Sequence, residues 1–151
     1  MQEMFNDVLE KEESIIQVHK PNRKKFWWSV NLLTLASIIG IPFWPFILLY
    51  ARAYYKNRFY AYSDRRIIIR GGVIGIDYKC LRFKDITATV VRVSPLDRML
   101  KTNTGSVEFG SPGSQLGTQA NGTSNPYVFQ HIEKPYEVLK EINELIEEVR
   151  K

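Results

Sequence analysis

The stretch PYEVLKEINELIEEVR, residues 135–150, is the clearest helical signal in this sequence of 151 residues. Pro135 suits the first turn of a helix. From Val138 onward the apolar side chains recur at i, i+1, i+4, i+7, i+8 and i+11, so they share one face, while glutamates and Lys140 take the others. Such a helix needs an apolar surface to cover. We therefore expect a C-terminal helix over about residues 134–150 that closes a sheet or a barrel.

Short runs typical of β-strands precede this helix and are separated by turn residues. They lie at residues 59–62, 66–70, 76–82, 86–93, 106–109 and 127–132. The run ITATVVRV, residues 86–93, is rich in β-branched side chains and predicts a central strand. Gly71 and Gly72 supply turn chemistry between two of the runs. This order predicts a mainly β domain over residues 56–151, closed by the C-terminal helix.

A long apolar segment at residues 26–55, FWWSVNLLTLASIIGIPFWPFILLYARAYY, precedes the β-like runs. Its first 26 residues carry no charge, whereas about 18 suffice to suggest a membrane helix. It is flanked by the bases Lys20, Arg23, Lys24, Lys25, Arg52, Lys56 and Arg58, and Trp27, Trp28, Tyr54 and Tyr55 lie near its ends, as in membrane interfaces. We expect a helical membrane segment at 26–55, after an N-terminal juxtamembrane lead at 1–25.

Two membrane geometries remain open for this segment. A single kinked span would be long enough to cross a bilayer, but it would leave bases on both sides. A re-entrant hairpin turning at residues 40–45, where one glycine and two prolines lie, would keep both basic clusters on the cytoplasmic side. Each arm of about 14 residues would then measure roughly 21 Å, short of a core of about 30 Å. A helix buried in the globule is the remaining alternative.

The charge is unevenly distributed along the chain. There are 21 basic and 16 acidic residues, a net charge of +5. The excess of bases falls after the apolar segment and in the first half of the β domain, where it suits anionic lipid or an acidic protein partner. The candidate lipid- or partner-binding residues are Arg65, Arg66, Arg70, Lys79, Arg82 and Lys84. Simple attraction to an anionic surface, without a specific pocket, remains an equal alternative for this set.

Residues that carry catalysis or bind metals do not form a recognisable pattern in the sequence. His19 and His131 are far apart, and Cys80 is the single cysteine. No phosphate-binding glycine loop, paired set of metal ligands or nucleophile elbow is present in the sequence. We therefore expect a protein that is not an enzyme and that takes no cofactor, no metal and no nucleic acid.

Several short motifs, in order, resemble the membrane-flanked bacterial pleckstrin-homology family. They are YSDRRI at residues 62–67, FKDI at 83–86, VSPLDR at 93–98 and GSV at 105–107, followed by the terminal helix. Each motif is weak by itself, and the resemblance rests on their order and spacing. It implies a pleckstrin-homology-like barrel, in which two bent antiparallel sheets are plugged by the C-terminal helix.

Together these features predict a non-enzymatic module at the cell membrane, with its soluble domain in the cytoplasm. It would bind the anionic lipid surface or a protein partner at the cytoplasmic face. The alternative is a structural subunit or scaffold of a membrane protein complex, as a homo- or hetero-oligomer, because small and polar side chains in the first half of the apolar segment could mediate helix contacts.

Overall fold

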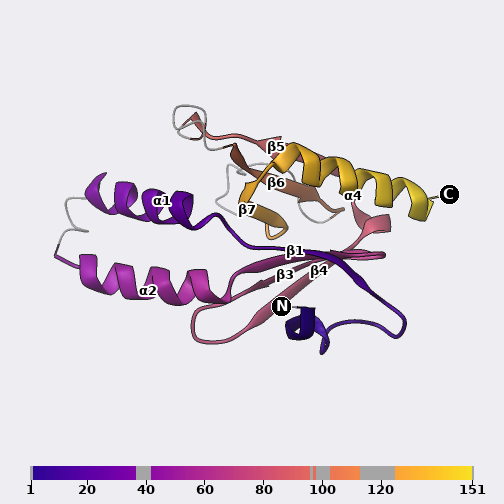
Figure 1. The fold of residues 1–151 in the computed structure, drawn as a ribbon, viewed down its shortest axis with the longest axis horizontal. Coiled ribbons are helices and arrows are strands. Elements are labelled where there is room, and N and C mark those ends of the chain that lie inside the picture. The colour runs from indigo at the N-terminus through magenta and orange to yellow at the C-terminus, as the bar shows by residue number, and fades with distance from the viewer. Residues whose placement is uncertain (1, 37–41, 96, 98–102, 113–124, 151) are drawn as a thin grey trace.

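The described part of the chain forms two antiparallel sheets, three long helices and a short N-terminal segment. The computed structural model describes residues 2–36, 42–95, 97, 103–112 and 125–150. The C-terminal helix lies along the sheets, and the other two long helices project side by side from one end of the molecule (Figure 1). The two chain termini lie away from that helical end (Figure 1).

The first sheet has four strands in the order β1-β2-β3-β4. These are β1 (Ile15–His19), β2 (Phe59–Ser63), β3 (Arg66–Gly71) and β4 (Asp77–Arg82), all paired antiparallel. Side chains alternate between the two faces of a strand. In β2, Tyr60 and Tyr62 therefore enter the main core, while Phe59 and Ala61 point to the other face of the sheet.

The second sheet has three strands in the order β5-β6-β7. They are β5 (Ala88–Arg92), β6 (Thr104–Gly110) and β7 (Val128–Glu133), and the short 3-10 helix η3 (Phe83–Asp85) links the two sheets. The predicted central strand at 86–93 is instead an edge strand, because among the described strands of this sheet only β6 has a partner on both sides. Its β-branched residues suit any half-buried pleated surface, so they do not specify a central position.

The main core joins both sheets to helix α4 (Pro135–Arg150). Tyr60 stacks on Phe129 across the two sheets, with ring centroids 4.8 Å apart. From α4, Val138, Ile142 and Ile146 are buried in the same cluster. This confirms a β-rich, pleckstrin-homology-like fold closed by a C-terminal helix.

The predicted helical membrane segment is wrong. The chain there forms two helices of 14 residues each, α1 (Arg23–Ala36) and α2 (Trp44–Asn57). Throughout the described part of the chain, no helix combines the length and the apolar character that crossing a bilayer requires. A 14-residue helix measures about 21 Å, against an apolar layer of about 30 Å. Neither the kinked span nor the re-entrant hairpin is retained. Residues 40 and 41 of the proposed turn at 40–45 lie outside the described residues.

The sequence suggested a membrane span because residues 26–51 form an unbroken run without charge. Helix α2, however, begins inside this run, at Trp44. Pro45 stands in the first turn of α2, where a proline is tolerated because that turn has no partner for its N–H. Helix α1, for its part, begins with three bases outside the uncharged run and contains Ser29, Asn31 and Thr34. The apolar residues are therefore divided between two short amphiphilic helices.

The N-terminal segment covers the outer face of the four-stranded sheet. After the short helix η1 (Gln2–Phe5), the chain runs back along this face to β1. Phe5 is fully buried against Phe59, Ala61 and Ile68, which form a second apolar cluster. Strand β1 then forms the edge of the sheet, beside β2.

Candidate functional site

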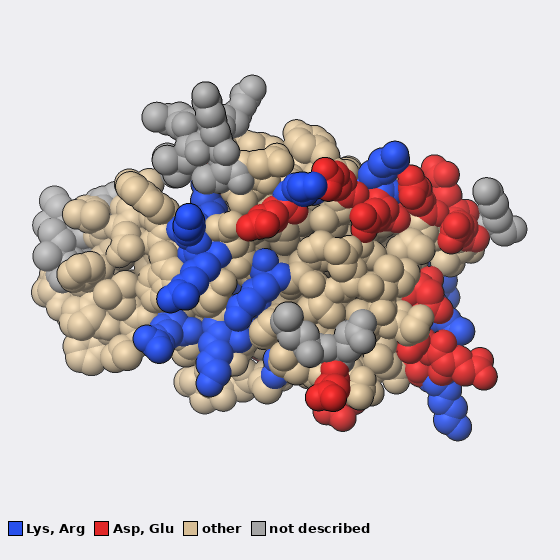
Figure 2. Space-filling model, in the orientation of Figure 1, with Lys and Arg blue, Asp and Glu red and all other residues tan. Residues whose placement is uncertain are grey.

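Helices α1 and α2 expose an unusually large set of apolar side chains. We call these residues the apolar helical face: Trp28, Leu32, Leu33, Leu35, Phe43, Trp44, Phe46, Leu49 and Tyr50, each between 43% and 73% exposed. In Figure 2 the helical end of the molecule shows almost no charged side chain. Large exposed apolar patches on a folded protein usually mark a surface that binds a partner or a membrane.

An aromatic cluster fixes the base of the two helices to the barrel. Phe26 of α1 is buried and stacks on Tyr54 of α2, with ring centroids 6.1 Å apart. It also packs against the tilted ring of Tyr55, whose centroid is 5.1 Å away. The Tyr55 hydroxyl donates a hydrogen bond to the Pro21 carbonyl at 3.1 Å. Two of the aromatic residues expected at a membrane interface thus hold the helices in place, and Trp28 is the one most exposed to solvent, at 60%.

Bases gather where the helices meet the barrel. We call Lys20, Arg23, Lys24, Arg52, Lys56 and Arg58 the basic collar; all except the half-buried Arg58 are exposed. Figure 2 shows Lys and Arg side chains beside the uncharged helical end, while Asp and Glu side chains lie mainly along α4 and at the opposite end. On the face drawn in Figure 2, the uncharged helical end is thus followed by a basic zone, and acidic side chains are most frequent along α4.

Two members of the collar are held on aromatic rings. The Lys20 ammonium lies 4.8 Å from the ring centroids of both Tyr55 and Phe59. The Arg58 guanidinium lies 4.7 Å from the Tyr54 centroid, and its Nε donates a hydrogen bond to the Tyr60 hydroxyl at 2.8 Å. Such contacts orient a cation without neutralising it. These two bases therefore remain available to an anionic surface.

Lys25, which was expected among the juxtamembrane bases, is instead buried in an ion pair. Its ammonium lies 2.5 Å from Asp97, and both side chains are only 4% exposed. Burial by itself would raise the pKa of Asp97, but hydrogen bonds from Lys25 and Thr104 outweigh it and hold this pKa below its usual value. Lys25 therefore anchors α1 to the barrel and is left out of the collar.

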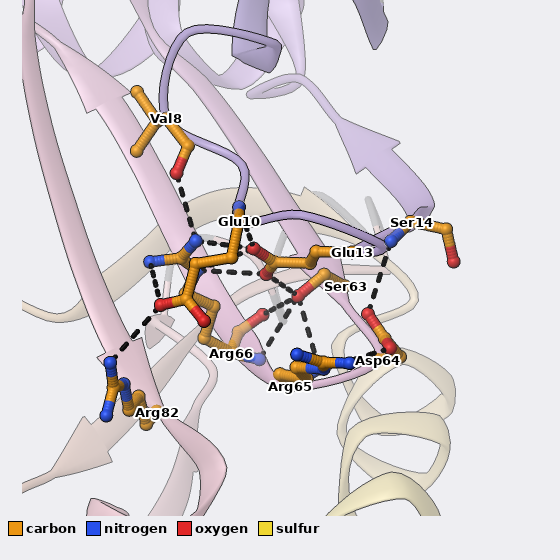
Figure 3. A network of polar contacts seen from close by, with 9 residues as sticks. All are labelled: Val8, Glu10, Glu13, Ser14, Ser63, Asp64, Arg65, Arg66 and Arg82. Carbon is orange, nitrogen blue, oxygen red and sulfur yellow. Dashed lines mark hydrogen bonds and ion pairs between the residues drawn. The ribbon is translucent and has the colours of Figure 1, made fainter.

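Four of the six candidate bases of the β domain come together at the far end. Arg65, Arg66, Arg82 and Lys84 line a cavity of ≈240 Å³ with Glu10 and Val149. In Figure 3, Glu10 lies between the guanidinium groups of Arg66 and Arg82, while Arg65 lies beside Asp64 on the turn between β2 and β3. This cavity lies at the opposite end from the helical pair, because that turn and the end of α4 lie away from α1 and α2 (Figure 1).

The other two candidate bases lie elsewhere. Arg70 lies over the Phe59 ring, 5.7 Å from its centroid, and its Nη1 is 2.8 Å from the Met4 sulfur. Lys79 lines a wide, open cavity of ≈940 Å³ together with Arg58 and with Arg92, whose Nε lies 2.7 Å from Glu108. The six bases therefore do not form one surface, because the curvature of the sheet separates them.

Arg66 is the candidate whose surroundings differ most from expectation. Its Nε donates to both oxygens of Glu13, at 2.9 and 3.1 Å, and its Nη2 donates to Glu13 and to the Val8 carbonyl at 2.9 Å (Figure 3). Burial favours the protonated form of Glu13, but hydrogen bonds from Arg66, Ser63 and the Glu10 backbone lower its pKa to about 2. This pair could not be predicted from the sequence, because its members are 53 positions apart.

Two curved antiparallel sheets closed by a C-terminal helix define a pleckstrin-homology-like domain, a class whose members are generally binding modules. The family model described as "Bacterial PH domain" matches residues 21–149. The chain therefore belongs to the bacterial pleckstrin-homology domain family, and the predicted membership is confirmed.

A solved structure supports the same fold. The chain is similar to the crystal structure of a DUF1696 family protein with a pleckstrin-homology domain from Shewanella loihica PV-4. The TM-score is 0.51 with 10% sequence identity, and the match covers 95% of this chain and 91% of that one. At this identity the likeness concerns the fold alone. No curated protein matches the chain.

Proposed function

We propose that this protein is a non-catalytic binding module that docks on an anionic lipid surface with its apolar helical face and basic collar. The observation that carries the proposal is the adjacency of these two zones at one end of the molecule (Figure 2). Docking of this kind places helices in the interface between headgroups and acyl chains, and no helix has to cross the bilayer. The proposed location is the anionic inner face of the cell membrane.

Both zones are needed for binding of useful strength. A base near an anionic leaflet contributes about 1 kcal/mol, so the six collar bases would supply on the order of 6 kcal/mol if all reached the surface. Partial insertion of leucine, phenylalanine and tryptophan side chains adds an apolar contribution of about 25 cal/mol per Å² removed from water. The electrostatic part falls with salt, whereas the apolar part does not.

The charge distribution also sets the orientation. Helix α4 carries glutamates along its exposed side, and in Figure 2 acidic side chains lie away from the helical end. An anionic surface repels the exposed side of α4 while it attracts the collar. The lipid surface therefore favours one orientation, with the helical end down and the barrel away from the lipid.

Vesicle sedimentation of the full chain tests the proposal. We expect binding to phosphatidylcholine vesicles that contain phosphatidylglycerol, and much weaker binding to phosphatidylcholine alone. Trp28 and Trp44, which are 60% and 50% exposed, should shift their fluorescence to shorter wavelength on docking. Failure of the wild-type chain to sediment with anionic vesicles would overturn the proposal.

Two double variants, each with a control variant on α4, test the apolar helical face and the basic collar separately. Leu33→Glu with Phe46→Glu should abolish binding, whereas Tyr136→Glu, which changes a similarly exposed residue of α4, should not. Lys24→Glu with Arg52→Glu should remove the preference for anionic lipid, whereas Lys140→Glu on α4 should keep it. A different outcome would indicate that a second copy of the chain covers the apolar helical face. In that case the wild-type chain would form a stable dimer and would not bind vesicles, and the double variant Leu33→Glu with Phe46→Glu would be monomeric.

A further inference from the structure

We propose that the small basic cavity at the end remote from the helices is a second site, which takes a phosphate-bearing anion from solution. The cavity of ≈240 Å³ is lined by Glu10, Arg65, Arg66, Arg82, Lys84 and Val149. Its cations come from the turn between β2 and β3, the start of β3, the end of β4, and η3. Successive elements thus bring four positive side chains to one small space, and Glu10 and Val149 join them from near the two ends of the chain.

The N–H donors of the four cations are not all engaged by partners within the described residues. Lys84 is exposed and makes no hydrogen bond or ion pair there. Arg65 lies 3.5 Å from Asp64 with half of its side chain exposed, and Arg82 is 55% exposed. Arg66 holds Glu13 with its Nε and Nη2, but its Nη1 has only Glu10 at 3.5 Å. Each cation therefore keeps at least one N–H for a ligand.

Glu10 occupies the position that such a ligand would take. One of its carboxylate oxygens, Oε1, lies 3.2 Å from Nη2 of Arg82 and 3.5 Å from Nη1 of Arg66 (Figure 3). Its backbone is held independently of that carboxylate, because its N–H donates to Glu13 at 2.9 Å and its carbonyl accepts from the Glu13 N–H at 3.1 Å. The 46% exposed side chain can therefore turn toward solvent while the segment stays in place.

The charge balance indicates the class of ligand. Four cations face the carboxylates of Glu10, Glu13 and Asp64, so one positive charge is left while Glu10 is in place. When Glu10 turns away, two positive charges are left, which a phosphate monoester dianion neutralises. Guanidinium groups suit phosphate because two parallel N–H donors can meet two phosphate oxygens. A neutral ligand would leave these charges uncompensated.

The location separates this site from the proposed lipid-docking surface. In Figure 1, α1 and α2 project from one end, whereas the turn between β2 and β3 and the end of α4 lie at the other. A vesicle bound through the helices would be held away from the cavity. The anion is therefore expected to arrive as a soluble phosphomonoester rather than as the headgroup of the docked membrane.

Titration of the full chain with glycerol 3-phosphate, followed by NMR of the arginine Nε–H groups, tests this inference. We expect the Arg65 and Arg82 signals to shift in the wild-type chain, with neutral glycerol causing no shift. Glu10→Gln should tighten binding about tenfold, because it removes a competing carboxylate. Lys84→Met and Arg82→Met should each weaken it about tenfold or more, since each removes a charged hydrogen bond.

The controls distinguish anion binding in the cavity from lipid docking through the helices. They also distinguish a soluble phosphomonoester from a lipid headgroup as the source of the phosphate. Lys140→Met changes an exposed base of α4 and should leave binding unchanged. Leu33→Glu with Phe46→Glu should lose vesicle binding but keep glycerol 3-phosphate binding, and phosphatidic acid vesicles should not compete for the cavity. Absence of any shift in the wild-type chain, or an equal affinity in Glu10→Gln, would overturn the inference; so would phosphatidic acid vesicles that displace glycerol 3-phosphate.

Discussion

The carboxylate of Glu13 is fully buried and is held by the guanidinium of Arg66, so that this pair fastens the N-terminal segment to the barrel. The Ser63 hydroxyl donates to the same carboxylate at 2.5 Å, which ties the turn between β2 and β3 into the network. The pair joins a segment outside the matched family region, 21–149, to a strand inside it.

Removal of Glu13 should strongly destabilise the protein. Glu13→Ala leaves the guanidinium of Arg66, which is 11% exposed, without its partner, and breaking a buried pair in this way costs about 3–5 kcal/mol. Glu147→Ala removes an exposed carboxylate of α4 and should change the free energy of unfolding by about 0.5 kcal/mol or less. Urea denaturation of both variants measures the difference, and an equal midpoint for the two would contradict a stabilising pair.

Stability should fall in acid because of the same carboxylate. The pKa of Glu13 is about 2 in the folded protein, against an ordinary value of 4.5. A pKa that is lower in the folded state means that ionised Glu13 stabilises the fold above about pH 4.5, and this stabilisation is lost as the pH falls from 4.5 toward 2. Urea midpoints measured across this range should decline less steeply in Glu13→Gln than in the wild-type chain.

Phe5 should contribute as much to stability as a residue of the main core. It is fully buried against Phe59, Ala61 and Ile68 on the outer face of the sheet. Phe5→Ala should therefore cost about 3–5 kcal/mol. Ile16→Val, which changes an exposed residue of β1, serves as the control and should cost much less. Amide hydrogen exchange should show whether loss of Phe5 exposes β2 and β3 selectively, as the packing predicts.

Gly105 should not tolerate a methyl group. A Cβ at this position would lie 2.9 Å from Cγ of Pro135 and 3.0 Å from the carbonyl oxygen of Arg92. Neither a proline ring nor a paired strand backbone can move freely, so Gly105→Ala should cost about 1–3 kcal/mol. Gly75→Ala adds the same methyl group where nothing lies within 4 Å and should be nearly neutral. Thermal unfolding of the two variants tests the contrast.

Much of the fold could be predicted from local pattern. The apolar spacing from Val138 to Ile146 predicted α4 and its buried face, and the β-rich runs predicted the six strands of the main β domain with small shifts at their ends. These signals are readable because periodicity and turn chemistry act within a few residues. The resemblance carried by the ordered motifs supplied the family, which the match over residues 21–149 confirms.

The candidate sites were less predictable because they depend on distant partners. The sequence identified the bases but not which would be paired: Arg66 is held by Glu13, and Lys25 by Asp97, 72 positions away along the chain. It also could not show that Arg65, Arg82 and Lys84 converge on one cavity while Arg70 and Lys79 lie elsewhere. Strand curvature and pairing register decide those distances.

The sequence by itself determined the order of strands, the terminal helix and the concentration of apolar residues before the β domain, since each depends on local spacing. Only the tertiary structure decided that the apolar run becomes two short helices side by side and that Glu10 and Glu13 return to the arginines of the barrel. The physical reason is that hydropathy records how much apolar surface a segment has. What covers that surface, and which charge meets which, depends on contacts between residues far apart in the chain.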